Sequence, residues 1–189
     1  MLRAWRLTDA PLLKGAIDAN LEHLRRWMPW ALNEPSPASV IEQRIDKFDQ
    51  RFRADSEWNY AIFSDGEKML YGGIGMRRST TKGALEIDLW LGEGWTSKGY
   101  ATEAVKALVD AAFALPNIER VQMRCDVRNA KGCAVASRAG FAQTETLKND
   151  KFGVAAMRDT AVWERSRTPG AAPEPPRRGF FGWLKSLFS

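Results

Sequence analysis

The alternation of hydrophobic and polar positions predicts a chain that mixes helices and strands. Residues 2–7 read as a strand, and Thr8-Asp9 is a plausible cap for the helix that follows. Apolar residues then recur every three or four positions to about Arg26, as on one helix face, until Trp27-Met28-Pro29-Trp30 interrupts them. A second helical pattern ends near Arg53. Its inward side is expected to carry Val40, Ile41, Ile45, Phe48 and Phe52.

The remainder of the chain reads as a run of strands broken by two helices. The expected elements are strands at 58–63, 69–76 and 84–91, a helix at 99–115, a strand at 120–127, a short helix at 131–138, and strands at 141–147 and 160–165. The order is therefore βαα-βββ-α-β-α-ββ. This order predicts an α/β (α+β) chain with an antiparallel front half and a helix crossover behind it.

Composition narrows the class of protein. The 189 residues are 44% hydrophobic and 27% charged, which suits one globular domain. No run approaches the roughly 18 apolar residues of a membrane span, and no secretory signal is visible, so we expect a cytoplasmic location. Two cysteines in segments that read as buried, and one histidine, predict a reducing compartment and no metal site. The net charge of +5 identifies no nucleic-acid partner.

The chain divides into a domain at 1–165, a Pro/Gly-rich linker at 166–178 and an amphipathic segment at 179–189. The last segment gathers its aromatic and leucine residues on one helical side. Three uses of it stay open. It could lie at an anionic surface such as the inner membrane, dock in a partner's groove, or fold back on its own domain.

The most informative stretch runs from Leu89 to Ala104, where a strand ends, a glycine-containing loop follows and a helix begins near Gly99. Backbone N–H groups at a helix start favour an anion, and glycine lets a ligand approach the main chain. Ordinary loop chemistry explains the same residues. The spacing fits neither a Walker loop nor the three-glycine dinucleotide motif, because Lys98 precedes its glycine.

Several segments together resemble one family. Lys98-Gly99-Tyr100-Ala101-Thr102-Glu103-Ala104 is similar to the pyrophosphate-binding loop of the GNAT acetyltransferases, in the RimJ/RimL-like branch. Asp88-Leu-Trp-Leu91, the strand from Arg120 to Asn129, Ala139-Gly-Phe141 and Leu24-Arg-Arg-Trp-Met-Pro-Trp30 resemble other motifs of that branch, in the same order. The resemblance covers about residues 1–165.

The resemblance implies a strongly bent mixed sheet of six to seven strands, flanked by helices and splayed between the fourth and fifth strands. Acetyl-CoA would lie in the opening as co-substrate, with its pyrophosphate on the amides of 96–101. The expected contacts are Leu89, Trp90, Leu91, Thr96, Ser97, Lys98, Gly99, Tyr100, Ala101, Thr102 and Asn129. Two positions depart from the family pattern. Thr96 replaces a Gln or Arg, and Gly132 replaces a serine that can protonate the leaving thiolate, so the general acid is unassigned; Cys133 or water could serve.

Acetyl transfer to an amine needs a base that removes a proton from the ammonium group. Strand alternation puts Glu86, Asp88 and Trp90 on one face of 84–91, and the two like charges should raise the pKa of one carboxyl. We expect Glu86 as base with Asp88 as its partner. A solvated strand face is the alternative interpretation, and Asp150 is a weaker candidate.

Other candidates carry ordinary explanations beside the catalytic one. Trp27 and Trp30 are expected to line the acceptor mouth, with plain core packing as the alternative. His23 is a weak candidate base, Cys125 is expected in the core, and Cys133 as a small hydrophobe.

The sequence hypothesis is therefore an N-acetyltransferase that moves acetyl from acetyl-CoA directly to a primary amine, either a protein N-terminus or a small molecule. One rival is a CoA-binding sensor or scaffold that has lost catalysis, which Gly132 motivates. A second rival is an interaction module tethered to a membrane surface by the C-terminal segment.

Overall fold

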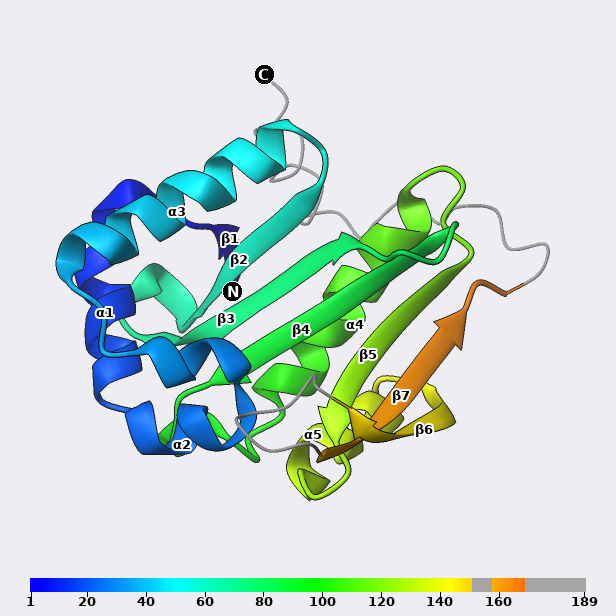
Figure 1. The fold of residues 1–189 in the computed structure, drawn as a ribbon. Helices are drawn as coiled ribbons and strands as arrows, with labels where there is room; N and C mark the ends of the chain where they lie inside the picture. Colours follow the sequence, from blue (N-terminus) through cyan, green and yellow to red (C-terminus); the bar gives the residue numbers. More distant parts are fainter. Residues whose placement is uncertain (151–157, 169–189) are drawn as a thin grey trace.

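The fold was analysed in a computed structural model that describes residues 1–150 and 158–168 (Figure 1). The amphipathic segment 179–189, and the linker apart from its first three residues, lie outside the described residues. The predictions made for them therefore stay predictions.

Seven strands form one mixed sheet in the order β1-β2-β3-β4-β5-β7-β6. All neighbouring strands are antiparallel except β4 and β5, which run parallel. The strands are β1 Leu2–Ala4, β2 Glu57–Phe63, β3 Leu70–Arg78, β4 Ala84–Leu91, β5 Arg120–Asp126, β6 Ala142–Asp150 and β7 Arg158–Ser166. The predicted mixed sheet is confirmed.

The seam between β4 and β5 is short. The two strands pair over four positions, from Ala84 opposite Arg120 to Ile87 opposite Met123. Beyond that point β4 continues to Leu91 and β5 to Asp126 without pairing with each other. The predicted splay between the fourth and fifth strands is confirmed, and it creates an edge of unpaired backbone inside the sheet.

Helices cover both faces of the sheet. Helices α4 (Tyr100–Ala114) and α5 (Ala130–Arg138) lie behind it in Figure 1, where α4 packs Ala104, Val105 and Leu108 against Leu85 and Ile87 of β4. Helices α1 (Ala10–Asp18), α2 (Leu21–Trp27) and α3 (Ala38–Arg53) form a second core on the front face. Strand alternation therefore sends Glu86, Asp88 and Trp90 to the front and their apolar neighbours to the back.

The single helix expected up to Arg26 is in fact two helices, with a break at Ala19-Asn20. The Asn20 side chain donates to the Ala16 carbonyl at 2.8 Å, and its Oδ1 accepts from the backbone N–H of Glu93 at 2.8 Å. This contact ties the break to the loop after β4. Glu93 is 73 positions away from Asn20 in the sequence, so this hydrogen bond cannot be seen in the local pattern of apolar residues. The prediction of a single helix was therefore wrong.

The first strand is also shorter than expected, because Leu7–Asp9 form a 3-10 turn. The Asp9 carboxylate does not cap the helix after it. It accepts from the backbone N–H of Arg6 at 2.8 Å and from the buried guanidinium of Arg3 at 2.6 and 2.8 Å. Two burial expectations were wrong as well: Val40 is 39% exposed, and Cys125 with Cys133 is only half-buried.

Candidate active site

The loop between β4 and α4 ends in a helix start without a side-chain cap. Helix α4 begins at Tyr100, and Gly99 at its N-cap adopts a φ of 89°, a conformation that glycine accepts without strain. A Cβ added at Gly99 would meet no atom within 4 Å, so the space beside it is open. The first amides of α4 and the positive end of its dipole therefore face an open space that suits an anion.

Cationic and aromatic side chains surround this helix start. Lys131 donates to Thr96 Oγ1 at 3.1 Å, and Arg138 approaches Thr102 Oγ1 at 3.5 Å, both from α5. Lys98 lies 4.6 Å above the Trp95 ring. The sequence analysis did not single out Lys131 or Arg138, since only the packing of α5 beside α4 brings them here.

The separated ends of β4 and β5 form the next wall of the site. Asn129, expected beside the pantetheine, follows β5 and caps α5 by accepting from the Gly132 N–H at 3.0 Å. A Cβ at Gly132 would lie 2.8 Å from Asn129 Nδ2. A larger residue at 132 would require the Asn129 amide to shift, and the glycine present offers no side chain that can act as an acid.

The two cysteines lie against each other beside this wall, with their Sγ atoms 2.9 Å apart. The Cys133 thiol also approaches the Asp126 carbonyl at 3.8 Å. Burial, followed by the contact with Cys133, raises the pKa of the Cys125 thiol. A thiol that keeps its proton is a poor nucleophile.

Glu86 and Asp88 both project from the front face of β4, but their environments differ. Glu86 is 7% exposed and paired with Arg77 at 2.7 Å and Arg124 at 3.9 Å. The Asp88 side chain is 56% exposed, and its one ion pair among the described residues is a longer contact of 3.3 Å with Arg77. Glu86 is therefore held in place by two guanidinium groups, whereas Asp88 is accessible.

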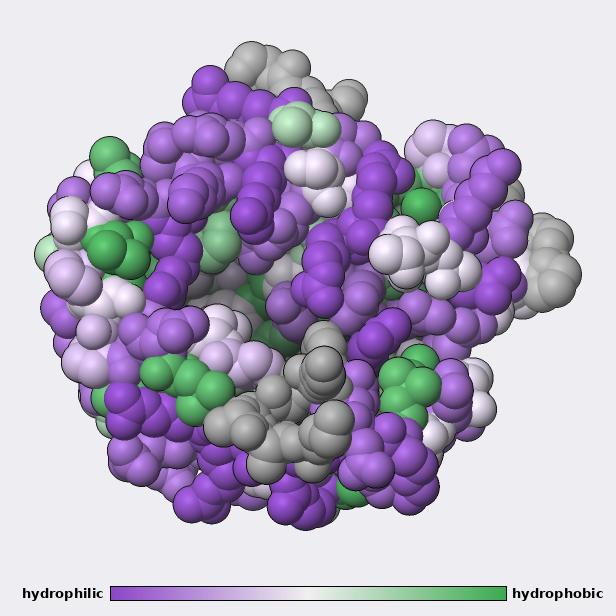
Figure 2. Space-filling model, viewed as in Figure 1, coloured by the Kyte–Doolittle hydropathy of each residue, from purple (hydrophilic) through white to green (hydrophobic). Residues whose placement is uncertain are grey.

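The pKa of Asp88 is raised above its usual range. Desolvation by the surrounding protein is the main cause; Arg77 opposes it, and the charges of Glu57 and Glu86 add to it. Asp88 is exposed, yet Arg77, Glu57 and Glu86 lie close enough to act on it, and we call this part of the front face of the sheet the acid floor. The front surface of the molecule is hollowed near its centre (Figure 2). A carboxylate with a raised pKa accepts a proton more readily than an ordinary one.

Glycines on β3 make room for the side chains of this floor. Gly75 pairs with both Asn59 and Asp88, and a Cβ there would lie 2.6 Å from Asn59 Oδ1 and 2.7 Å from Asp88 Oδ1. A Cβ at Gly73 would lie 2.8 Å from Trp90 Nε1. The sequence analysis missed these glycines, although their spacing in the strand Gly72-Gly73-Ile74-Gly75 was a visible signal of close approach.

Aromatic residues border the same floor. Trp30 meets Trp90 edge-on, with ring centroids 6.0 Å apart, and packs against the front core. Trp27 is half-buried at the end of α2. Trp30 thus lies next to the acid floor, because it contacts Trp90 on the same face of β4 as Asp88. Packing against the front core accounts for part of the burial of Trp30.

The remaining candidates lie away from the acid floor. Burial is the main cause that lowers the pKa of His23 on α2, and the charges of Lys131 and Arg26 add to it while that of Glu93 opposes it. Asp150 ends β6 in register with Arg158. Arg158, in turn, donates to Asp126 at 2.9 Å and to the Arg26 carbonyl at 3.0 Å, which links β7 to β5 and α2.

A family model described as "Acetyltransferase (GNAT) domain" matches residues 1–142. The chain belongs to the GNAT acetyltransferase family. Its fold, its splayed strands and the resemblance drawn from the loop motif agree with this finding, and the chain is accordingly an acyltransferase.

Proteins similar to this GNAT acetyltransferase include some whose names give different acceptors. "Probable N-acetyltransferase YjcK" of Bacillus subtilis is 26% identical over 166 residues, covering 86% of this chain and 88% of that protein. Spermidine N(1)-acetyltransferase of Escherichia coli is 25% identical, over 72% of this chain and 69% of that protein. A structure of RimL, a ribosomal L7/L12 alpha-N-protein acetyltransferase in complex with coenzyme A, has a TM-score of 0.80 at 20% identity and covers 87% of this chain and 92% of that one.

The described part of the acetyltransferase shows neither a membrane-spanning helix nor a metal-ligand cluster. Within residues 1–150 and 158–168, no helix has both the length and the apolar character needed to cross a membrane. The same residues contain no cluster of three or more His, Cys, Asp and Glu that could hold a metal ion.

Proposed function

We propose that this GNAT acetyltransferase moves the acetyl group of acetyl-CoA directly to a primary amine. The observation that carries the proposal is the uncapped start of α4, which adjoins the edge where β4 and β5 part. Helix-start amides bind phosphate groups, and the parted strands offer backbone to an extended pantetheine arm. The coenzyme A complex of the similarly folded RimL is consistent with this arrangement.

The residues expected to hold the coenzyme fit it chemically. The amides of 96–101 would receive the pyrophosphate, the space beside Gly99 leaves room for it, and Lys131 and Arg138 add positive charge. Leu89, Trp90 and Leu91 would border the pantetheine on one side and Asn129 on the other. Bound there, the coenzyme supplies the thioester carbonyl.

Asp88, rather than Glu86, is our candidate base. Glu86 is buried in ion pairs with two arginines, whereas Asp88 is exposed and has the raised pKa of a proton acceptor. Asp88 takes a proton from the ammonium group, directly or through water, and the neutral amine then attacks the thioester carbon. Glu86 is a positioning residue, because it orients Arg77 beside Asp88.

The remaining steps need little from side chains. Backbone N–H groups of β4 that face the opening stabilise the oxyanion, since β5 no longer pairs with them. The tetrahedral intermediate then expels the thiolate, and water carries the second proton of the former ammonium nitrogen to the thiolate sulfur, because Gly132 offers no acid. An acetyl-cysteine intermediate is disfavoured by the raised pKa of Cys125 and the inward contact of Cys133.

A matched pair of variants tests the coenzyme site. Ser97→Asp adds a negative charge at an exposed position just before α4, and Thr80→Asp adds the same charge in the exposed turn between β3 and β4. We expect Ser97→Asp to weaken coenzyme A binding about tenfold or more in titration calorimetry, because the added charge repels the pyrophosphate. Thr80→Asp should bind as the wild type does.

Turnover is measured separately, by following free thiol released from acetyl-CoA with a panel of amines and N-terminal peptides. Release with any acceptor supports the proposed transferase. Binding without release across the panel would instead support a coenzyme-binding protein that has lost catalysis, the rival that Gly132 motivates. Equal coenzyme binding by Ser97→Asp and wild type would remove the basis for the proposed site.

A further inference from the structure

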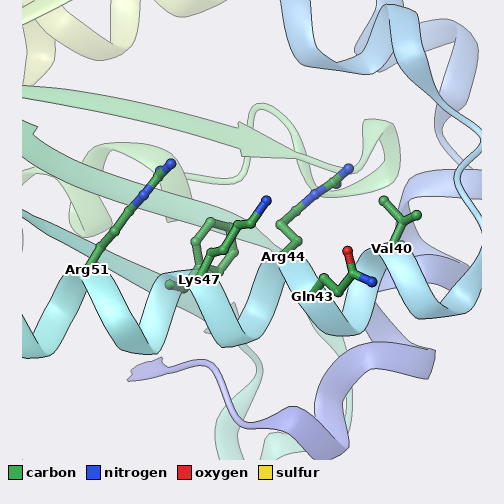
Figure 3. Close-up of a pocket in the computed structure, with 6 residues that line it drawn as sticks. Val40, Gln43, Arg44, Lys47 and Arg51 are labelled. Atoms are coloured by element: carbon green, nitrogen blue, oxygen red, sulfur yellow. The ribbon is translucent and has the colours of Figure 1, made fainter.

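A stripe of basic side chains runs along one side of α3. Arg44, Lys47 and Arg51 follow each other at spacings of three and four residues, so they share one helix face. Figure 3 shows the three side chains pointing the same way from the helix. They line a pocket of about 190 Å³ together with Val40, Gln43 and Phe48. We call these three residues the basic stripe.

The residues at both ends of the basic stripe, Arg51 and Arg44, contact residues that border the acid floor. Arg51 pairs with Glu57 of β2 at 2.6 Å, and Glu57 is aligned through Arg77 with Glu86 across the sheet. At the other end, Arg44 pairs with Glu34 and lies 5.7 Å above the ring of Trp30. The stripe therefore forms a wall beside the acid floor, because Arg51 pairs with Glu57, whose charge acts on Asp88.

The wall keeps an excess of positive charge. Each guanidinium has five N–H donors, and Arg44 and Arg51 each use only some of these donors in an ion pair with one carboxylate. Lys47, which lies between them, is exposed and forms no ion pair within the part of the chain that the structure describes. Such a wall attracts an anionic group, whereas the floor attracts the ammonium group of an acceptor.

The separation of wall and floor sets a distance between the two groups of an acceptor. Asp88 is two strands away from Asn59, which places the two backbones about 10 Å apart at the usual strand spacing of about 4.8 Å. The Asn59 amide donates to Glu57 at 2.8 Å, and Glu57 is the partner of Arg51 in the wall. An extended peptide advances about 3.3 Å per residue, so its third or fourth residue would reach the wall.

We propose that the acceptor is the N-terminal amine of an acidic peptide segment, held with its amine at Asp88 and the carboxylates of about its third and fourth residues on the basic stripe. This inference rests on the proposed transferase activity and deepens it. It also predicts that spermidine is a poor acceptor, although one relative bears the name of a spermidine acetyltransferase. The additional ammonium groups of a polyamine would be repelled by the wall.

The test compares three peptides that share the same first two residues and the same length. The third and fourth residues are Asp-Glu, Gln-Gln or Lys-Lys, and spermidine is the fourth acceptor. We expect kcat/KM to be at least about tenfold higher for Asp-Glu than for Lys-Lys, mainly through KM, with Gln-Gln between them. Added salt should reduce the difference, because it screens exposed charges.

A pair of charge reversals then locates the effect. Lys47→Glu should lower the ratio of kcat/KM for the acidic over the basic peptide at least tenfold, because it reverses the unpaired charge of the wall. Lys82→Glu makes the same change in the exposed turn before β4 and should leave the ratio as it is. An unchanged ratio in Lys47→Glu overturns the inference.

The outcomes also separate this inference from the proposed function. Acetylation of all three peptides at similar rates overturns the acidic-acceptor inference alone. Preferred acetylation of spermidine or of the basic peptide does the same. If none of the four acceptors is acetylated while coenzyme A still binds, both the inference and the proposed transfer reaction fail.

Discussion

Two carboxylates on the same strand face acquire different chemical properties from their neighbours. Glu86 is buried between Arg77 and Arg124, and Asp88, two residues further along β4, lies exposed on the acid floor. Environment rather than residue type separates a positioning group from a proton acceptor. The alternation of the strand predicted that both face one side, but the choice between them needed the register of β3 and β5, which supplies the arginines.

Removing the proton acceptor should slow the reaction. We expect Asp88→Asn to lower kcat about 100-fold or more, the usual contribution of a general base. A base works when deprotonated, so in the wild type kcat/KM should rise with pH through the raised pKa of Asp88, and Asp88→Asn should lose this limb. A pH profile of thiol release checks both effects.

Glu86→Gln is the control for this experiment. The charge of Glu86 raises the pKa of Asp88, so its removal should shift the limb to lower pH without abolishing it. The assignment of Asp88 is contradicted if Asp88→Asn keeps the limb and Glu86→Gln loses it.

At the scale of elements, the sequence predicted what local periodicity controls. Strand β4 lies where it was expected, and the alanine-rich pattern of α4 gave its ends to within one residue. The pattern could not predict the break before α2, because Asn20 is fixed by Glu93 from a distant loop. For the same reason, the partners Arg77 and Lys131 became visible only once strands and helices were assembled.

The junction between β1 and α1 depends on a buried ion pair. Arg3 and Asp9 are 6% and 4% exposed and bond through two contacts. Breaking a buried pair costs about 3–5 kcal/mol when the remaining charge has no other partner. Asp9→Ala leaves Arg3 its contact of 2.7 Å with Glu67, so the lower end of this range applies. We expect a loss of this order in urea unfolding at neutral pH. A double variant, Arg3→Met with Asp9→Leu, should recover part of it.

The same pair makes stability depend on pH. Burial alone would raise the pKa of Asp9, but hydrogen bonds from Arg3 and from the Arg6 N–H outweigh it and lower the pKa. A lowered folded pKa adds stability above the unfolded value of about 3.9 and loses it as the pH falls through the folded value. The stability difference between wild type and Asp9→Ala should therefore shrink on acidification, and a constant difference would contradict this account.

At the scale of the whole molecule, a coenzyme in the proposed site would contact both halves of the sheet. A ligand that binds only the folded state stabilises it by about 2.7 kcal/mol at 100 times its Kd. For a chain of this size, this corresponds to a rise of roughly 5–10 °C in Tm. Thermal unfolding with and without coenzyme A should show the rise for the wild type and Thr80→Asp, and a smaller one for Ser97→Asp.

The four paired positions between β4 and β5 also bear on which thioesters the protein accepts. Because the pairing is so short, few backbone hydrogen bonds join strands β1 to β4 with strands β5 to β7. We call these two parts of the sheet the plates. We expect that a small rotation of the plates about this pairing would widen the gap between them, without displacing packed side chains. Tolerance for an acyl group longer than acetyl should accordingly decline gradually with chain length, as the plates bend further apart, instead of ending at a sharp steric limit.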